Sequence, residues 1–538
     1  MKRISNIQEP KNNSRKPSII INMALSEWLL ILSGVLTILY FWISHHFSYW
    51  RRKNVPYIDP SYIFGNLKDM VLMKSCAADH MITLYSHKKA QNEPVVGFYI
   101  FNKPALLIRD LDLIKSVLIK DFNKFSDRFT TCDPHSDALG SFNLFFIKNP
   151  YWKEMRSKLS PVFTSGKIKQ MFPLVEEIGV ELDKYLCNLA LDSNTNVTEV
   201  KDICGLYTTD VIASVAFGVQ ANSLKNPNAE FRRNGKALFK FTPWRAFEFT
   251  VIFFLPQFVK IFGCKMFSKE AAQFLRGTIN YIMAERTKSG LIRNDLIDTL
   301  VAFKKAAEAD KDKQHIAQNT DMLVAQAAVF FTAGFETTSS SMSFGLYELS
   351  KKPELQKRLR QEIKDALVKC NGKINYDMIL EMEYLNMVLQ EVLRLYPPLP
   401  FLDRQCTLAE GEKEYSMKPL SDFGIPNGMP VYIPVYAIQR DPKFFPNPDE
   451  FDPERFSAAN KANFPQLAYM PFGTGPHNCI GERFGILQAK LGLINFLRNH
   501  SVTTCEKTHK KMILDPNALI IQSKGGIYLK IVRDPLLA

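Results

Sequence analysis

The sequence predicts a mainly α-helical protein with small β-sheets, placed behind an N-terminal membrane anchor helix. From Asp110 onward, the spacing of apolar residues is helical over most of the chain. The run from Trp28 to Ser44 contains no charged residue. We find no long linker, low-complexity block or repeat, so the sequence marks no division into several domains. Short apolar runs predict strands at 95–100, 105–108, 429–435 and 526–532.

The composition limits the classes of function. Lys and Arg number 68 against 54 Asp and Glu, which gives a formal net charge of +14. Because this excess is spread along the chain, it favours a basic face for an acidic protein partner or anionic lipid and argues against nucleic acid. The 9 cysteines form no C-x-x-C pair and no zinc-finger spacing, which is typical of a reduced, cytosol-facing protein.

The N-terminal region predicts a single membrane anchor. With its weakly polar flanks, the uncharged run reaches the about 17–25 residues that a spanning helix needs. We therefore expect an extension at 1–22, a transmembrane anchor at 23–50, a basic and proline-rich hinge at 51–60 and a catalytic domain at 61–538. The cluster Arg51-Arg52-Lys53 favours a cytosolic position for the remainder of the chain.

Two alternatives for this region are a cleaved signal peptide and a mitochondrial presequence. The run has no small-residue cleavage site, which argues against the first. Residues 1–22 are basic and contain Ser14 and Ser18, as a presequence would, but a spanning anchor follows them directly. Because basic residues also oppose a luminal start, we interpret 1–22 as an upstream extension, with Met23 as an alternative beginning.

A helix is predicted from Asp321 to Ser350, with Asn319 and Thr320 as cap candidates. Its middle, 333–341, places a glycine, an acid and five hydroxyl residues in an otherwise apolar helix. Glycine costs about 1 kcal/mol relative to alanine there, and Ser or Thr can draw a carbonyl out of the ladder. A local distortion beside a bound ligand explains this composition, and so does a small-residue crossing against another helix.

A second unusual segment, 239–267, combines ten aromatic residues with interleaved lysines and arginines. Aromatic residues at this density are typical of a core. The interleaved charges also suit a surface that dips into the membrane interface, because long basic side chains keep their charged ends in water. The composition leaves both interpretations open.

The stretch from Met470 to Gly481 predicts a stiff loop that presents Cys479 at the start of a helix over 482–499. Three glycines and two prolines lie within eleven residues, a density typical of turns and loops. The helix start favours thiolate over thiol, and glycines allow a flat group to approach the backbone. This pattern suits a haem iron with one cysteine ligand, and the alternative is a buried structural cysteine.

Five motifs, in this order along the chain, resemble those of the cytochrome P-450 family. His477 stands where the family usually has Arg, which offers less positive charge to a haem propionate. The overall likeness is to microsomal members, in the group of insect detoxification enzymes and vertebrate drug oxidisers. The motifs are W-x-x-x-R at 152–156, A-G-x-E-T-T at 333–338, E-x-x-R at 391–394, P-E-R-F at 453–456 and the cysteine loop at 472–481.

The resemblance implies the cytochrome P-450 fold, with 61–538 as one large domain that binds haem b. Cys479 would be the axial ligand of the iron. Thr337 would hydrogen-bond dioxygen, and Glu336 would feed protons through water. The resemblance also assigns a haem-binding role to Trp152, Arg156, Arg404, His477 and Phe472, and a structural triad to Glu391, Arg394 and Arg455.

The implied function is an NADPH- and O₂-dependent monooxygenase that inserts one oxygen atom into a lipophilic xenobiotic, lipid or hormone. NADPH–cytochrome P-450 reductase would supply electrons, with cytochrome b5 as a second donor, at the endoplasmic reticulum membrane. Alternatives are a haem-thiolate enzyme that rearranges peroxides without O₂, and a non-catalytic binder of haem or hydrophobic molecules. We expect the substrate lining to come from 126–148, from 215–260 and from the region after Pro400.

Overall fold

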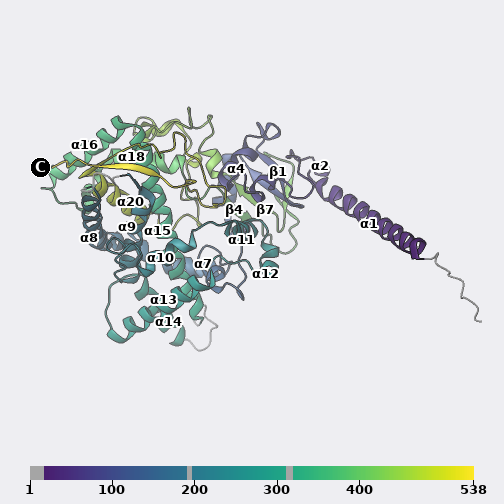
Figure 1. Cartoon of the computed structure of the whole chain (residues 1–538), viewed down its shortest axis with the longest axis horizontal. Helices are drawn as coiled ribbons and strands as arrows, with labels where there is room; N and C mark the ends of the chain where they lie inside the picture. Colours follow the sequence, from purple (N-terminus) through teal and green to yellow (C-terminus); the bar gives the residue numbers. More distant parts are fainter. Residues whose placement is uncertain (1–16, 191–196, 310–318, 538) are drawn as a thin grey trace, which may run out of the picture.

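The computed structural model describes residues 17–190, 197–309 and 319–537. A mainly helical body carries α1 (Pro17–Phe47) as a projecting rod at one end (Figure 1). The predicted mainly α fold with small sheets is confirmed. The other helices of at least eight residues are α4 (Ala77–Tyr85), α7 (Tyr151–Leu159), α8 (Ser165–Ala190), α9 (Val200–Ile212), α10 (Glu230–Leu238), α11 (Pro243–Phe254), α13 (Lys269–Ser289), α14 (Leu296–Ala309), α15 (Thr320–Lys351), α16 (Pro353–Lys369), α18 (Glu383–Leu395) and α20 (Glu482–Leu497).

Shorter helices connect these elements. They are α2 (Tyr49–Arg52), α3 (Lys68–Val71), α5 (Leu111–Lys115), α6 (Ala138–Phe142), α12 (Val259–Phe262), α17 (Tyr376–Glu381) and α19 (Val435–Ile438).

Three small sheets lie within this helical body. The largest has the order β1-β2-β7-β4, in which the antiparallel hairpin of β1 and β2 joins β7 in parallel. The four strand predictions are confirmed, the first with its exact bounds and the others with bounds shifted by no more than two residues. The strands are β1 (Val95–Ile100), β2 (Lys103–Ile108), β3 (Val197–Glu199), β4 (Leu402–Gln405), β5 (Glu414–Ser416), β6 (Gly424–Pro426), β7 (Pro430–Ile433), β8 (His500–Thr503) and β9 (Tyr528–Arg533).

Helix α15 runs through the middle of the body and packs against α9, α6 and α20. The Asn319 side chain caps its start by accepting a hydrogen bond from the Asp321 N–H at 2.9 Å. Most of its residues are buried, so tertiary packing outweighs the low helix propensity of its middle. At Gly334, a Cβ would lie 2.7 Å from the Ile212 side chain of α9. The glycine therefore permits a close helix crossing, one of the two explanations left open by the sequence.

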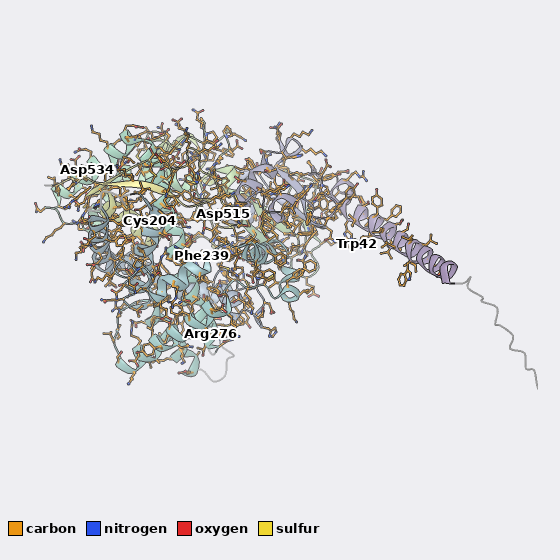
Figure 2. The ribbon with its side chains drawn as sticks, viewed as in Figure 1. Trp42, Cys204, Phe239, Arg276, Asp515 and Asp534 are labelled. Carbon is orange, nitrogen blue, oxygen red and sulfur yellow. The ribbon has the colours of Figure 1, made fainter. Side chains whose placement is uncertain are left out.

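The N-terminal helix ends three residues before the predicted end of the anchor at residue 50. Residues from Glu27 to Phe47 form a helix long and apolar enough to cross a membrane, and most of its side chains, such as Trp42, are exposed along the rod that projects from the body (Figure 2). Trp50, inside the predicted anchor, is instead fully buried against the β1–β2 sheet. The candidate membrane span therefore ends at Phe47. Residues 1–16 of the expected extension lie outside the described part of the chain.

Candidate active site

A cavity of about 290 Å³ lies between α15, the N-terminal end of α20 and the loop before it. The structure brings six of the eight predicted site residues to its wall: Thr337 from α15, Trp152 and Arg156 from α7, and Phe472, His477 and Cys479 from the loop. Arg404 lies behind this wall, and Glu336 lies outside it.

The cysteine loop is a tight turn, as its glycines and prolines predict. The Cys479 N–H donates to the Phe472 carbonyl at 2.8 Å, and the Asn478 N–H donates to the Gly475 carbonyl at 3.0 Å. Gly475 has φ of +73°, and a Cβ there would collide with the Leu118 carbonyl oxygen. A side chain at this position is therefore excluded both by the backbone conformation and by contact.

The thiol of Cys479 is accessible from the cavity, while the surrounding protein shields it from bulk water. Burial, together with the nearby Glu482, raises the pKa of Cys479 to about 11, although the Gly481 N–H and Arg156 act in the opposite direction. This corrects the expectation that the helix start alone favours thiolate, since burial outweighs it. A thiolate here requires a cation such as a metal ion bound to the sulfur.

A cluster of arginines lies at one side of the cavity. Arg404 of β4 is fully buried and donates through one nitrogen to the Asp403 carbonyl at 2.7 Å. Its Nε, and the Nε of buried Arg128, have no hydrogen-bond partner within the described residues. Burial, together with the positive charge of the neighbouring Arg128, lowers the pKa of Arg404 to about 9. A cluster with this excess of buried donors is suited to an anionic group.

Arg128 was missed by the sequence analysis. It lines the cavity and lies over the Phe145 ring, with 4.1 Å from its guanidinium carbon to the ring centroid. Its ion pair with Asp403 is 3.6 Å long. A lone arginine in a loop carries no local signal, because its role depends on strand β4, which lies far along the chain.

Arg156 and Trp152 occupy one side of α7, four residues apart. Arg156 donates both to the carbonyl and to the side-chain oxygen of Asn478 at 2.8 Å. The Trp152 ring lies 3.8 Å from the His477 ring, measured between centroids. Burial, with Arg404 and Arg128 close by, lowers the pKa of His477 well below its usual range. Both residues of the predicted motif therefore contact the cysteine loop.

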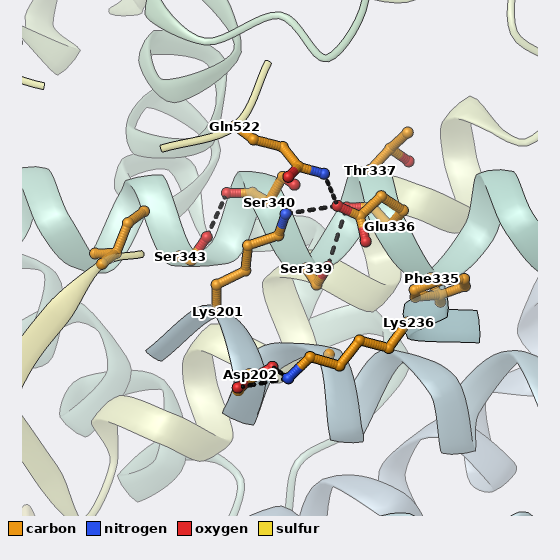
Figure 3. Close-up of polar contacts among 12 residues, drawn as sticks. Lys201, Asp202, Lys236, Phe335, Glu336, Thr337, Ser339, Ser340, Ser343 and Gln522 are labelled. Carbon is orange, nitrogen blue, oxygen red and sulfur yellow. Dashed lines mark hydrogen bonds and ion pairs between the residues drawn. The ribbon is translucent and has the colours of Figure 1, made fainter. Parts of the chain in front are cut away.

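Thr337 faces the cavity, and its hydroxyl donates to the Ala333 carbonyl at 2.7 Å. Glu336 is nearly fully buried on another side of α15. Its carboxylate pairs with Lys201 of α9 at 2.5 Å and accepts a hydrogen bond from Gln522 at 2.8 Å (Figure 3). The structure therefore brings Thr337 to the cavity but holds Glu336 away from it.

Apolar side chains form most of the remaining cavity wall. All three predicted lining regions contribute: the first supplies Leu144 and Phe145, and the second supplies Val215 and Ala216. The third region, after Pro400, supplies Leu402. The wall also includes Pro398 and Leu399, which lie just before the start of that predicted region. Val329, Phe330 and Ala333 of α15 complete this side. The wall suits an apolar ligand.

The predicted triad lies behind the loop. Arg394 and Glu391 are fully buried and form a bidentate pair with both distances at 2.7 Å. Arg455 approaches the same carboxylate at 3.4 Å. Arg394 also donates to the Gln439 and Pro448 carbonyls. The triad fastens the 439–455 segment to α18, and the Gln439 side chain accepts from the Met470 N–H, just before the loop.

The residues present fit a haem group. Cys479 offers one sulfur ligand, and the surface at Gly473 is open, because a Cβ there would have no neighbour closer than 3.9 Å. The buried and unpartnered Nε atoms of Arg128 and Arg404 are suited to the two carboxylates of haem. Planar, apolar and anionic parts of the group each have a matching surface.

Comparison with known proteins agrees with this geometry. The family model described as "Cytochrome P450" matches residues 55–531. The chain is 51% identical over 515 residues to "Probable cytochrome P450 6g2" of Drosophila melanogaster, covering 94% of this chain and 99% of the relative. It is 42% identical to "Cytochrome P450 6k1" of Blattella germanica, covering 96% and 98%. "Probable cytochrome P450 6v1" of Drosophila melanogaster is 44% identical.

Proposed function

Because the chain belongs to the cytochrome P450 family of haem-thiolate monooxygenases, and within it to the insect 6 family, we propose that it inserts one oxygen atom from O₂ into a lipophilic xenobiotic or endogenous lipid. One observation carries the proposal of a lipophilic substrate: Cys479 and Thr337 face the same cavity, whose remaining wall is largely apolar. Burial of apolar surface would bind and orient such a substrate.

Haem supplies the oxygen-activating chemistry when bound. The sulfur of Cys479 would be its ligand, and Arg128 and Arg404 would neutralise its carboxylates. The largely apolar wall would limit the access of water to the substrate. These roles follow from the position of each side chain at or behind the cavity wall.

Proton delivery falls to Thr337 and Glu336. The Thr337 hydroxyl uses its hydrogen on the Ala333 carbonyl, so its oxygen remains free to accept a hydrogen bond inside the cavity. The Glu336 carboxylate is held outside the cavity wall by Lys201 and Gln522. The alcohol therefore acts within the cavity, and the carboxylate supplies protons from the far side of α15.

The proposal also states how the protein binds the membrane and which protein supplies its electrons. Helix α1 anchors the protein in the endoplasmic reticulum membrane. Four exposed apolar side chains on α11, α12 and the turn between them form a second lipid contact: Trp244, Phe258, Ile261 and Phe262. The net charge of +14 favours an acidic NADPH-dependent reductase as electron donor, with cytochrome b5 as a second donor.

The test uses the full chain in membranes with the reductase and a set of lipophilic compounds. We expect NADPH- and O₂-dependent products that are heavier by one oxygen atom, labelled when the gas is ¹⁸O₂. Products that form from an organic peroxide alone, with no NADPH-dependent product, would identify the peroxide-rearranging alternative. Spectral haem without any product from either reaction would identify a binding protein.

A further inference from the structure

His477 stands where the family usually has arginine, and it makes a hydrogen bond that this difference alone does not predict. Its Nε2 atom lies 2.6 Å from the Ser126 carbonyl oxygen. Because a carbonyl oxygen only accepts, the ring donates its Nε2–H to the chain. The bond joins the cysteine loop to a segment 351 positions earlier in the sequence.

The His477 ring is held on its faces as well. Its centroid lies 3.8 Å from that of Trp152, with 34° between the ring planes, and 5.3 Å from that of Phe122. These contacts come from α7 and from the turn just before Ser126. The hydrogen bond and the packing together hold the ring in one orientation, with its Nε2–H directed at Ser126.

The segment that carries the Ser126 carbonyl is held in place through its next residue, Asp127. The Asp127 carbonyl accepts from the Gln405 N–H of β4 at 2.9 Å, and its carboxylate accepts from the Asn149 N–H at 2.9 Å. Arg128 follows directly and lines the cavity. His477 therefore ties the loop that carries Cys479, two residues away, to a fixed segment that carries a cation of the arginine cluster.

We propose that His477 is a positioning residue, which fixes the Cys479 loop to the 126–128 segment and does not bind the haem carboxylates. The carboxylates are left to Arg128 and Arg404, whose free Nε atoms face no other partner among the described residues. The inference rests on the proposed function in one respect, that haem occupies this cavity. It differs from the role of the arginine that the family has at this position.

The test compares His477→Phe and His477→Gln in the full-length, haem-loaded protein. Phenylalanine keeps a ring against Trp152 but cannot donate to Ser126, whereas the glutamine amide can. We expect His477→Phe to shift the iron–sulfur stretching frequency and to speed haem transfer to apomyoglobin about tenfold, the effect of losing one hydrogen bond to a partly buried carbonyl. His477→Gln should restore both quantities to within about twofold of the wild type.

Resonance Raman bands of the haem carboxylates separate the two roles. We expect them unchanged in His477→Phe and shifted in Arg404→Gln, which serves as the positive control. A shift of the carboxylate bands in His477→Phe would overturn the inference, because the ring would then contact the carboxylates. An unchanged haem transfer rate in that variant, or a failure of His477→Gln to restore it, would overturn it too. The proposed function is judged separately, from the wild-type spectrum and products.

Discussion

At the scale of single residues, Cys479 carries the strongest prediction. Cys479→Ser replaces a sulfur ligand with a hydroxyl that ionises far less readily, so the thiolate is lost. The reduced, CO-bound variant should lack the red-shifted Soret band that the wild type shows. Cys505→Ser, a change at a partly exposed cysteine outside the cavity, is the matched control and should keep the band. If the Cys479 variant kept it, the assignment of the ligand would be wrong.

Thr337 carries a second prediction at this scale. Thr337→Ala should still bind haem and substrate and still consume NADPH, but it should release hydrogen peroxide in place of oxidised product. General acid–base assistance is worth about 10²–10⁴-fold, so the ratio of product to NADPH should fall steeply. The measurement is product and peroxide formed per NADPH.

Thr338→Ala is the control for that change. Thr338 is the next residue on α15, turned about 100° around the helix, and it is buried where Thr337 is partly open. It should lower the ratio of product to NADPH much less. Equal effects of the two changes would indicate that the hydroxyl cluster serves packing and that protons come by another route.

At the scale of helices and strands, α15, α9 and the C-terminal segment meet at Glu336. Lys201→Met removes the cation from a carboxylate whose side chain is 6% exposed, while Lys201 itself is 20% exposed. Breaking a fully buried pair costs about 3–5 kcal/mol, so for this partly exposed pair we expect the free energy of unfolding to fall by about 1–3 kcal/mol. Urea denaturation of the haem-loaded protein measures it.

Two further variants make this prediction specific. Adding Glu336→Gln should recover at least half of the loss, because the unpaired charge is gone. Lys236→Met is the matched control (Figure 3), since Lys236 pairs with Asp202 at the surface and its loss should cost less than about 1 kcal/mol. A double variant no more stable than Lys201→Met would mean that Lys201 contributes by packing alone.

Prediction from sequence succeeded where the signal is local. The capped helix at 320–351, the strands and the turn that presents Cys479 all follow from residues close together in the chain. Contacts between distant segments were not predicted. Neither the pairing of Glu336 with Lys201 nor the place of Arg128 beside β4 has a local pattern. The pKa of Cys479 was misjudged for the same reason, because burial depends on the whole fold.

At the scale of the whole molecule, the N-terminal apolar helix is joined to the body through residues that pack on the β1–β2 sheet. Trp50 lies over Gly97 of β1, and its indole N–H donates to the Phe98 carbonyl at 3.0 Å. The Tyr99 hydroxyl donates to the Phe47 carbonyl, the last residue of α1, at 2.7 Å. Residues 47–50, the end of the predicted anchor, therefore dock on the sheet. The orientation of the anchor is coupled to that of the catalytic domain.

Three N-terminal deletions test this arrangement. Removing 1–22 should leave membrane association and haem content intact, because the candidate span begins at Glu27. Removing 1–47 should take away the span but keep Trp50, so the protein should fold with haem and become extractable from membranes by alkaline carbonate. Removing 1–52 also removes Trp50, and loss of a buried aromatic side chain costs about 3–5 kcal/mol. This form should denature at lower urea and retain less haem.

The comparison between the last two deletions isolates the structural role of Trp50 from that of the membrane, since neither form has an anchor. A Trp50→Ala change in the full chain adds the reverse case, in which the anchor is present and the indole ring is absent. It should stay in the membrane and show most of the same loss of stability.

If deletions to 47 and to 52 were equally stable, the docked segment would not stabilise the catalytic domain. If removal of 1–22 lowered the haem content, those residues would belong to the folded protein and the interpretation of an upstream extension would be wrong.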